Sequence, residues 1–149
     1  MNEQIDEFVV VGNGVLIKYN GKATHVEIPK NVKVITDAFS TNETVKSVVI
    51  GNNVETIGYS AFAGCTNLVR VTVSSKVKVI EASAFSSCKN LAEIYLPSSL
   101  GSIGQSAFSR CSSLKTVNFA GSQKSWSKIT VEKGNDVLTS TTINYSVKP

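Results

Sequence analysis

The sequence predicts an α/β solenoid, a coil of stacked repeats with short parallel strands on one face and short helical or 3₁₀ turns on the other. The first observation is a repeat of 23 residues, marked in each copy by an Ala-Phe pair whose phenylalanines are Phe39, Phe62, Phe85 and Phe108. The second is an alternation of apolar and polar residues such as Val71-Thr72-Val73, which is typical of a strand with one buried face. A period of this length indicates coils that become stable only when they stack.

The strands are expected near the start of each repeat. An aliphatic residue opens each copy, and the two apolar strand positions that follow are Val48/Ile50, Val71/Val73, Ile94/Leu96 and Val117/Phe119. A shorter copy precedes them at Val26-Glu27-Ile28-Pro29. Because like residues recur at a fixed step, stacked coils place them in continuous buried columns about 4.8 Å apart. Two more such columns follow the strands: Val32/Val54/Val77/Leu100 and Ile35/Ile57/Ile80/Ile103.

The Ala-Phe pair predicts a turn of helix in each repeat. The residue before it is Asp37, Ser60, Ser83 or Ser106. These residue types are good helix N-caps, because a side-chain oxygen accepts a hydrogen bond from an otherwise unpaired backbone N–H. We therefore expect Ala-Phe-x-x-Cys/Asn to form one short helical or 3₁₀ turn with its phenylalanine pointing inward.

The two ends depart from the repeat and are expected to cap it. Residues 1–22 contain two Asn-Gly pairs around a strand at 15–19, which predicts a small hairpin because Asn-Gly favours the type I′ turn. Residues 23–120 are assigned to the repeats and residues 121–149 to a carboxyl-terminal cap. A short helix is expected near 125–129, with Trp126 in the core of the cap, and a final strand near 142–147. The whole chain 1–149 is thus interpreted as a single domain, which suits its length.

The repeat pattern resembles that of the BspA-type leucine-rich repeat, as the stretch from Leu91 to Ser113 illustrates. The segments "VVGNGVLIKYNGKATHVEIPKNV" and "FAGSQKSWSKITVEKGNDVLTSTTINYS" are similar to the flanking segments of such proteins, so the resemblance covers about residues 8–147. It implies a right-handed solenoid with a parallel sheet on one face and a bacterial or microbial-eukaryote surface protein used in adhesion. The acidic amino terminus carries no signal peptide, so a cytoplasmic location stays open. The chain also lacks a regular asparagine ladder after the strand, since Lys76 and Ser99 follow Asn31 and Asn53.

Composition argues against nucleic acid and membrane partners. The net charge is +4, but the Lys and Arg residues are scattered, whereas nucleic-acid binders concentrate them on one face. The longest apolar run is Phe8-Val9-Val10-Val11, far shorter than the roughly 20 residues needed to span a bilayer. We therefore expect neither nucleic-acid binding nor membrane insertion.

The residues that most often carry catalysis or metal binding have ordinary structural interpretations here. Cys65, Cys88 and Cys111 share one column of the repeat, so they point the same way and suit buried, inert thiols better than a tetrahedral zinc site. His25 is the only histidine and is expected on the surface. No nucleophile elbow, phosphate loop or H-E-x-x-H motif is present. The prediction is a non-enzymatic protein without cofactor or metal.

The outward face of the strands is the candidate binding site, because packing does not dictate its side chains. Its first column is His25, Ser47, Arg70, Glu93 and Thr116. Its second column is Glu27, Val49, Thr72, Tyr95 and Asn118. Tyr95, Arg70 and Val49 are the expected anchors, since aromatic and arginine side chains lead binding hot spots.

Two functions follow from this face, and the residues do not decide between them. One is recognition or adhesion, with a protein or glycan partner bound on the outward sheet. The other is a structural spacer or self-associating solenoid of a larger surface protein, in which the same face is merely solvated. The protein is expected to be a monomer or to self-associate weakly through exposed strand edges.

Overall fold

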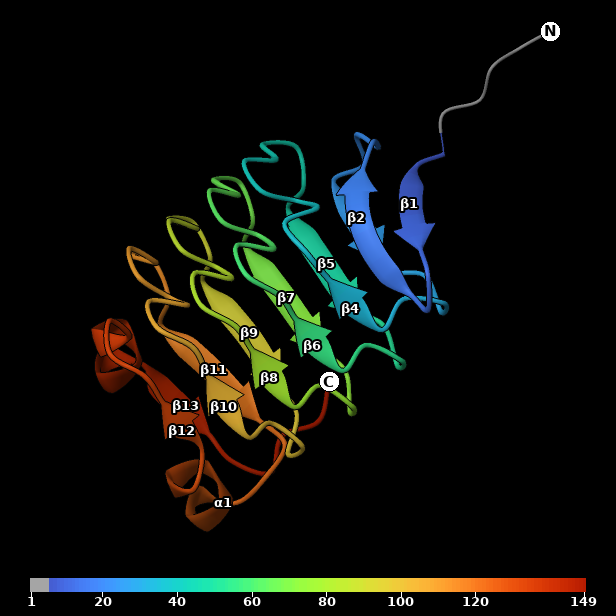
Figure 1. The fold of residues 1–149 in the computed structure, drawn as a ribbon. Coiled ribbons are helices and arrows are strands. Elements are labelled where there is room, and N and C mark those ends of the chain that lie inside the picture. The colour runs from blue at the N-terminus through green and yellow to red at the C-terminus, as the bar shows by residue number, and fades with distance from the viewer. Residues whose placement is uncertain (1–5) are drawn as a thin grey trace, which may run out of the picture.

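Two sheets, not one, form the long faces of the solenoid in a computed structural model that describes residues 6–149 (Figure 1). The six-stranded sheet is parallel and contains β3 (His25–Glu27), β5 (Ser47–Ile50), β7 (Arg70–Val73), β9 (Glu93–Leu96), β11 (Thr116–Phe119) and β13 (Thr142–Asn144). The seven-stranded sheet contains β1 (Phe8–Val11), β2 (Val15–Tyr19), β4 (Val34–Ile35), β6 (Thr56–Ile57), β8 (Val79–Ile80), β10 (Ser102–Ile103) and β12 (Thr130–Val131). The expectation of a strand sheet on one face only is therefore corrected: the column Ile35/Ile57/Ile80/Ile103 belongs to a second sheet.

The strands pair in the register that the repeat predicts. Val48 lies opposite Val71, Val71 opposite Ile94, and Ile94 opposite Val117, so like residues stand in one buried column. Each such residue is at most 1% exposed. Neighbouring coils therefore bury each other's apolar surface, as the energetics of stacked repeats require.

The phenylalanines form a continuous aromatic stack through the core. Ring centroids of Phe39 and Phe62 are 4.9 Å apart, those of Phe62 and Phe85 5.3 Å, and those of Phe85 and Phe108 5.4 Å. Tyr19 extends the stack at 4.7 Å from Phe39. The prediction that these phenylalanines point inward and stack is confirmed.

The turns that carry the Ala-Phe pairs are not helical, and this corrects the prediction of N-capped helical turns. Ser60, Ser83 and Ser106 have φ values of 54°, 59° and 56°, in the left-handed region instead of the extended region of an N-cap. Every second backbone N–H of the turn donates to a carbonyl of the next coil: the amide of Phe62, for example, donates to the Ala84 carbonyl at 2.7 Å. The N–H groups between them bond within the turn, as from Ala63 to Ser60 at 3.1 Å. A helix cannot form, because it would need all of these donors for itself.

The amino-terminal hairpin is formed by β1 and β2, and β2 also pairs with β4, so the hairpin is part of the first coil. Its turn differs from the expected type I′ turn. Gly12 has a positive φ of 55°, whereas Asn13 does not, and the Gly14 amide donates to the Val11 carbonyl at 3.3 Å. The pair Asn20-Gly21 makes no hairpin turn, because Asn20 continues the strand pairing and donates to the Glu7 carbonyl at 2.7 Å.

The carboxyl-terminal segment extends both sheets through β12 and β13 and adds the two helical pieces among residues 6–149. Helix α1 (Gln123–Ser127) starts two residues before the expected position, because the Ser122 hydroxyl accepts from the Ser125 amide. A 3₁₀ helix η1 (Asp136–Ser140), which was not expected, covers the end of the core with Leu138. Strand β13 ends at Asn144, short of the expected 147.

Trp126 of α1 is half-buried and packs against the core, with its ring 5.1 Å from that of Phe119 in an edge-on contact. It therefore belongs to the core of the cap, as expected from the sequence.

Candidate functional site

The ten candidate residues lie on the outward side of the six-stranded sheet, in two in-register columns. The pairs run from His25 to Ser47, Arg70, Glu93 and Thr116 in one column, and from Glu27 to Val49, Thr72, Tyr95 and Asn118 in the other. His25, Glu27 and Arg70 are exposed, and six others are partly exposed. The parallel register brings together residues 22 or 23 positions apart in the chain, which is how a short repeat builds a broad surface.

Hydrogen bonds between coils link the polar members of this face. Nδ1 of His25 lies 2.6 Å from the Ser47 hydroxyl. The Arg70 Nε donates to Oε1 of Glu93 at 3.0 Å, while Nδ2 of Asn118 donates to Oε2 of the same carboxylate at 2.7 Å. Glu93 is thus held from both sides. A pair as exposed as Arg70 and Glu93 contributes little stability, typically below about 1 kcal/mol, so its effect is to orient the two side chains.

Asn118 is the one candidate that the structure removes from the accessible face. Its residue exposure is only 5%, because β13 lies beside β11 and the Nδ2 group of Asn144 donates to the Asn118 Oδ1 at 2.9 Å. Thr142 and Asn144 are the sixth members of the two columns and were not predicted from the sequence. They follow Thr116 and Asn118 by 26 residues instead of 23, so the repeat period does not reveal them.

A hollow of about 500 Å³ opens beside this face, at the carboxyl ends of β7 and β9. Tyr95 belongs to both the face and the hollow. The other lining residues are Asn52, Val73, Ser74, Ser75, Leu96, Pro97, Ser98, Ala120, Lys148 and Pro149. A second hollow of about 420 Å³ shares Asn52 and Ser74 with the first and reaches Glu27 and Val49. The two hollows are therefore adjacent along the edge of the candidate face, and together they are called the groove here.

The carboxyl-terminal tail forms one wall of the groove. The Val147 amide donates to the Phe119 carbonyl at 3.0 Å, and the Ser146 amide donates to the Gly121 carbonyl at 2.8 Å. These bonds direct the chain across the strand ends, toward β9 and β7 (Figure 1). Lys148 brings a positive charge to a hollow whose other lining side chains are uncharged.

The cysteine column is buried, as predicted, and its thiols have hydrogen-bond partners. The thiols of Cys65, Cys88 and Cys111 donate to the Phe39, Phe62 and Phe85 carbonyls, each at 3.0 Å. The neighbouring Cys111 thiol lowers the pKa of Cys88, but the Cys65 thiol and burial raise it more, so that its pKa is about 12. For Cys111, the neighbouring Cys88 thiol and burial both raise the pKa well above the usual range of a thiol.

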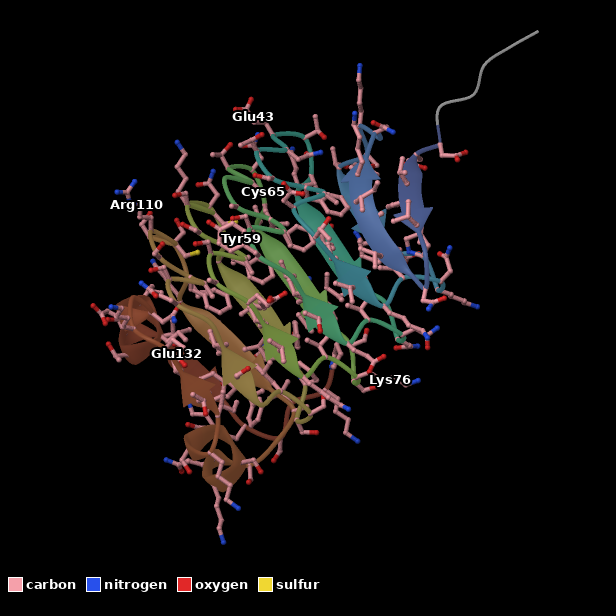
Figure 2. All side chains as sticks on the ribbon, in the orientation of Figure 1. Glu43, Tyr59, Cys65, Lys76, Arg110 and Glu132 are labelled. Atoms are coloured by element: carbon pink, nitrogen blue, oxygen red, sulfur yellow. The ribbon has the colours of Figure 1, made fainter. Side chains whose placement is uncertain are left out.

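The location of these thiols separates them from the charged side chains of the same turns. Figure 2 shows Glu43 and Arg110 extending outward from the turns, whereas Cys65 lies within them. Within residues 6–149, no three His, Cys, Asp or Glu side chains are grouped so that they could hold a metal ion. In the same part of the chain, no helix has the length and apolar character needed to cross a membrane.

Comparison with known proteins assigns the repeats to a family. The model for the BspA type Leucine rich repeat region matches residues 17–136 with six copies. The chain belongs to this family. The BspA-type repeat matched over most of the chain is thus the unit that builds the two sheets, and leucine-rich repeat domains generally mediate protein interactions.

Several solved structures similar to this chain are bacterial leucine-rich repeat proteins. A leucine rich repeat protein of T. pallidum is 28% identical with a TM-score of 0.75, and the match covers 87% of this chain and 62% of that one. A leucine rich cell surface protein of Faecalibacterium prausnitzii is 26% identical with a TM-score of 0.64, covering 83% and 40%. A leucine-rich repeat protein of Bacteroides capillosus is 27% identical with a TM-score of 0.64, covering 78% and 96%. This chain spans less than two thirds of the first two proteins, and no curated protein matches it.

Within this BspA-type chain, two ladders of side chains tie adjacent coils together. At the position of the incomplete asparagine ladder, Nδ2 of Asn53 donates to the Lys30 carbonyl at 2.7 Å, and the Ser99 hydroxyl donates to the Val77 carbonyl at 2.7 Å. A second ladder was not recognised from the sequence: the side-chain Nδ2 of Asn90 donates to the Thr66 carbonyl at 2.7 Å. Its signal was the 23-residue step from Asn67 to Asn90.

Proposed function

We propose that this chain is a non-enzymatic recognition module that binds a protein or glycan partner on the outward face of the six-stranded sheet. The observation that carries the proposal is the contrast between the two sides of that sheet. The inward columns repeat aliphatic residues and are buried, whereas the outward columns differ in charge, size and hydrogen-bonding type from coil to coil. Such variation on a rigid scaffold is what a recognition surface needs.

The chemistry of the face supports a specific contact rather than nonspecific adhesion. Arg70 and Tyr95 are residue types that dominate binding hot spots, and Arg70 is already oriented by Glu93. Orienting a side chain before binding reduces the entropy lost in the complex. Tyr95 also borders the groove, so a partner that covers the face can insert a side chain or a sugar ring beside it.

The strand face alone is small for a standard interface. Six strands spaced about 4.8 Å apart give a face about 24 Å long, and a four-residue strand makes it about 13 Å wide. The resulting area of about 300 Å² is well below the roughly 800 Å² that one partner buries in a standard interface, so the proposed partner also contacts the groove beside the face. A cell-surface location is part of the proposal, because the similar Faecalibacterium prausnitzii protein is described as a cell surface protein.

The test is a binding screen against a glycan array and a host-protein array, followed by a matched pair of triple variants. Replacing Arg70, Glu93 and Tyr95 together by Ala should abolish binding to any partner found. The control replaces Lys78, Glu81 and Tyr59 by Ala, which removes the same classes of side chain from exposed positions outside the six-stranded sheet.

The control variant should bind as the wild type does. Circular dichroism and thermal unfolding must show that both variants fold. If the first variant keeps full affinity, the outward face is not the binding site.

A further inference from the structure

The amino-terminal end of the seven-stranded sheet is an open strand edge. Strand β1 lies at one end of the strand order, and β2 is its only strand partner within residues 6–149 (Figure 1). An edge strand leaves half of its backbone N–H and C=O groups without a partner in the sheet. The strand reads Phe-Val-Val-Val, and it contains no charged residue or proline that would discourage pairing with another strand.

The other edge of the same sheet is shorter. Strand β12 has two residues, and the segment that follows it closes the last coil. There the Asn135 side chain accepts from the Phe108 amide at 2.9 Å, in the place where the next coil would offer a carbonyl. The two ends thus differ: at the carboxyl-terminal end a side chain closes the last turn and β12 offers only two residues, whereas β1 is a regular strand of four residues.

The side chains of β1 are arranged to continue the sheet. Phe8 and Val10 pack against the core, and Val9 and Val11 point to the opposite side, with Val11 44% exposed. The irregularity in the β1–β2 pairing places its extra residue, Ile17, in β2, since Val9 lies opposite Lys18 and Val10 opposite Leu16. Strand β1 itself therefore keeps a regular alternation, which a pairing strand requires.

We propose that β1 pairs with β1 of a second copy of this chain, antiparallel and about a twofold axis through Val9. This register places Phe8 opposite Val10 of the second copy, so that core-facing residues meet core-facing residues and the two cores lie on one side of a continuous sheet. A shift by one residue would set Phe8 against an outward-facing valine. A twofold contact is self-complementary, so one open edge on each copy is enough to close the dimer.

The charges around β1 are compatible with this register. Glu7 lies opposite Val11 of the second copy, so the two Glu7 side chains are four residues apart along the paired strands. At about 3.4 Å per residue this is about 14 Å, beyond the screening length of about 8 Å at physiological salt. Each Glu7 is also held on its own chain, where its Oε1 accepts from the Tyr19 hydroxyl at 3.3 Å.

The dimer is independent of the recognition proposal, because β1 belongs to the other sheet and the outward face of the six-stranded sheet stays free. Loss of the dimer with binding retained, or the reverse, separates the two. The interface is small, so a dimer dissociation constant in the micromolar range or weaker is expected.

The experiment is sedimentation equilibrium from about 5 to about 500 µM, the range in which a weak interface of this kind dissociates. The wild type should shift from monomer to dimer. In the Val9→Glu variant, the new carboxylate can pair with Lys18 within the monomer. In the dimer it also lies opposite the same carboxylate of the second copy. The dissociation constant of this variant should rise at least about tenfold, because like charges directly opposite each other destabilise a strand pair.

Two further samples complete the test. Val131→Glu introduces the same change at an exposed valine on the opposite edge of the sheet and should leave the dimer unchanged. An equimolar mixture of Val9→Glu and Val9→Lys should restore dimerisation, since opposite charges then meet at the axis. The proposal is overturned if the wild type stays monomeric to 500 µM. This holds even if a variant without residues 1–5 forms a dimer. A dimer that Val9→Glu does not weaken also overturns the proposal.

Discussion

Asn135 closes the last coil, and its replacement by alanine provides a direct test of how the solenoid ends. The residue is 4% exposed, and its side chain makes three hydrogen bonds. Its Oδ1 accepts from the Phe108 amide at 2.9 Å, and its Nδ2 donates to the Gly104 and Glu132 carbonyls at 2.9 Å each. The Phe108 N–H is buried, so in Asn135→Ala it loses its partner without gaining water. A buried donor left unpaired costs about 1–3 kcal/mol, and each lost bond to a carbonyl about 0.5–1.5 kcal/mol.

Together these losses give a decrease of about 3 kcal/mol in the free energy of unfolding, which for a chain of this length lowers Tm by about 10 °C. Urea unfolding followed by circular dichroism measures the first quantity and calorimetry the second. Hydrogen exchange supplies a local signal, because protection of the Phe108 amide should fall while that of the Phe62 amide, which is bonded to the next coil, should not. The control is Asn31→Ala at an exposed position. A loss below about 1 kcal/mol, or one equal to the control, would refute the argument.

Three further predictions concern the core. Because Cys88 has a pKa of about 12, its thiol should not react with a thiol reagent at neutral pH in the folded protein. The raised pKa also means that the unfolded chain releases the proton first, so the free energy of unfolding should fall as the pH rises from about 9 toward about 12, and urea unfolding across this range checks the sign. Phe85→Ala should lower the free energy of unfolding by about 3–5 kcal/mol, because both neighbours in the stack lose a contact. Phe8 is only half-buried and meets the end of the stack at Tyr19, with ring centroids 5.0 Å apart, so Phe8→Ala should cost clearly less. Equal losses by urea unfolding would contradict the stacked core.

The buried columns could be predicted because each depends on a residue type recurring at a fixed step. Phe62, Phe85 and Phe108 were placed inward, in contact with one another, from their spacing alone. The same step placed His25, Arg70 and their neighbours on one face of the sheet. Stacking in register converts a period in the chain directly into proximity in space.

The second sheet was missed for a physical reason. Strands such as β4, β6 and β8 have two residues each, so no alternation of apolar and polar residues can appear within one strand. Only the pairing of each strand with the corresponding strand of the next coil defines the sheet. The columns Ile35/Ile57/Ile80/Ile103 showed that these residues are buried but not which backbone groups bond.

The prediction of helical turns was wrong for a related reason. Ser60, Ser83 and Ser106 have the local chemistry of helix N-caps, and a prediction from local propensity favours that use. In the folded protein, alternate amides of these turns reach carbonyls of the next coil, and this competition between coils decides the backbone conformation.

Asn118 shows the same limit at the candidate site. Its exposure depends on β13, and the 26-residue step from Asn118 to Asn144 departs from the period by which the preceding coils were identified. The amino-acid sequence by itself thus determined which side chains are buried together, because residues that recur at a fixed step along the chain become neighbours when the coils stack. The tertiary structure decided where backbone hydrogen bonds run, how the ends close and which outward residues stay open, because each depends on contacts between segments that the repeat does not relate.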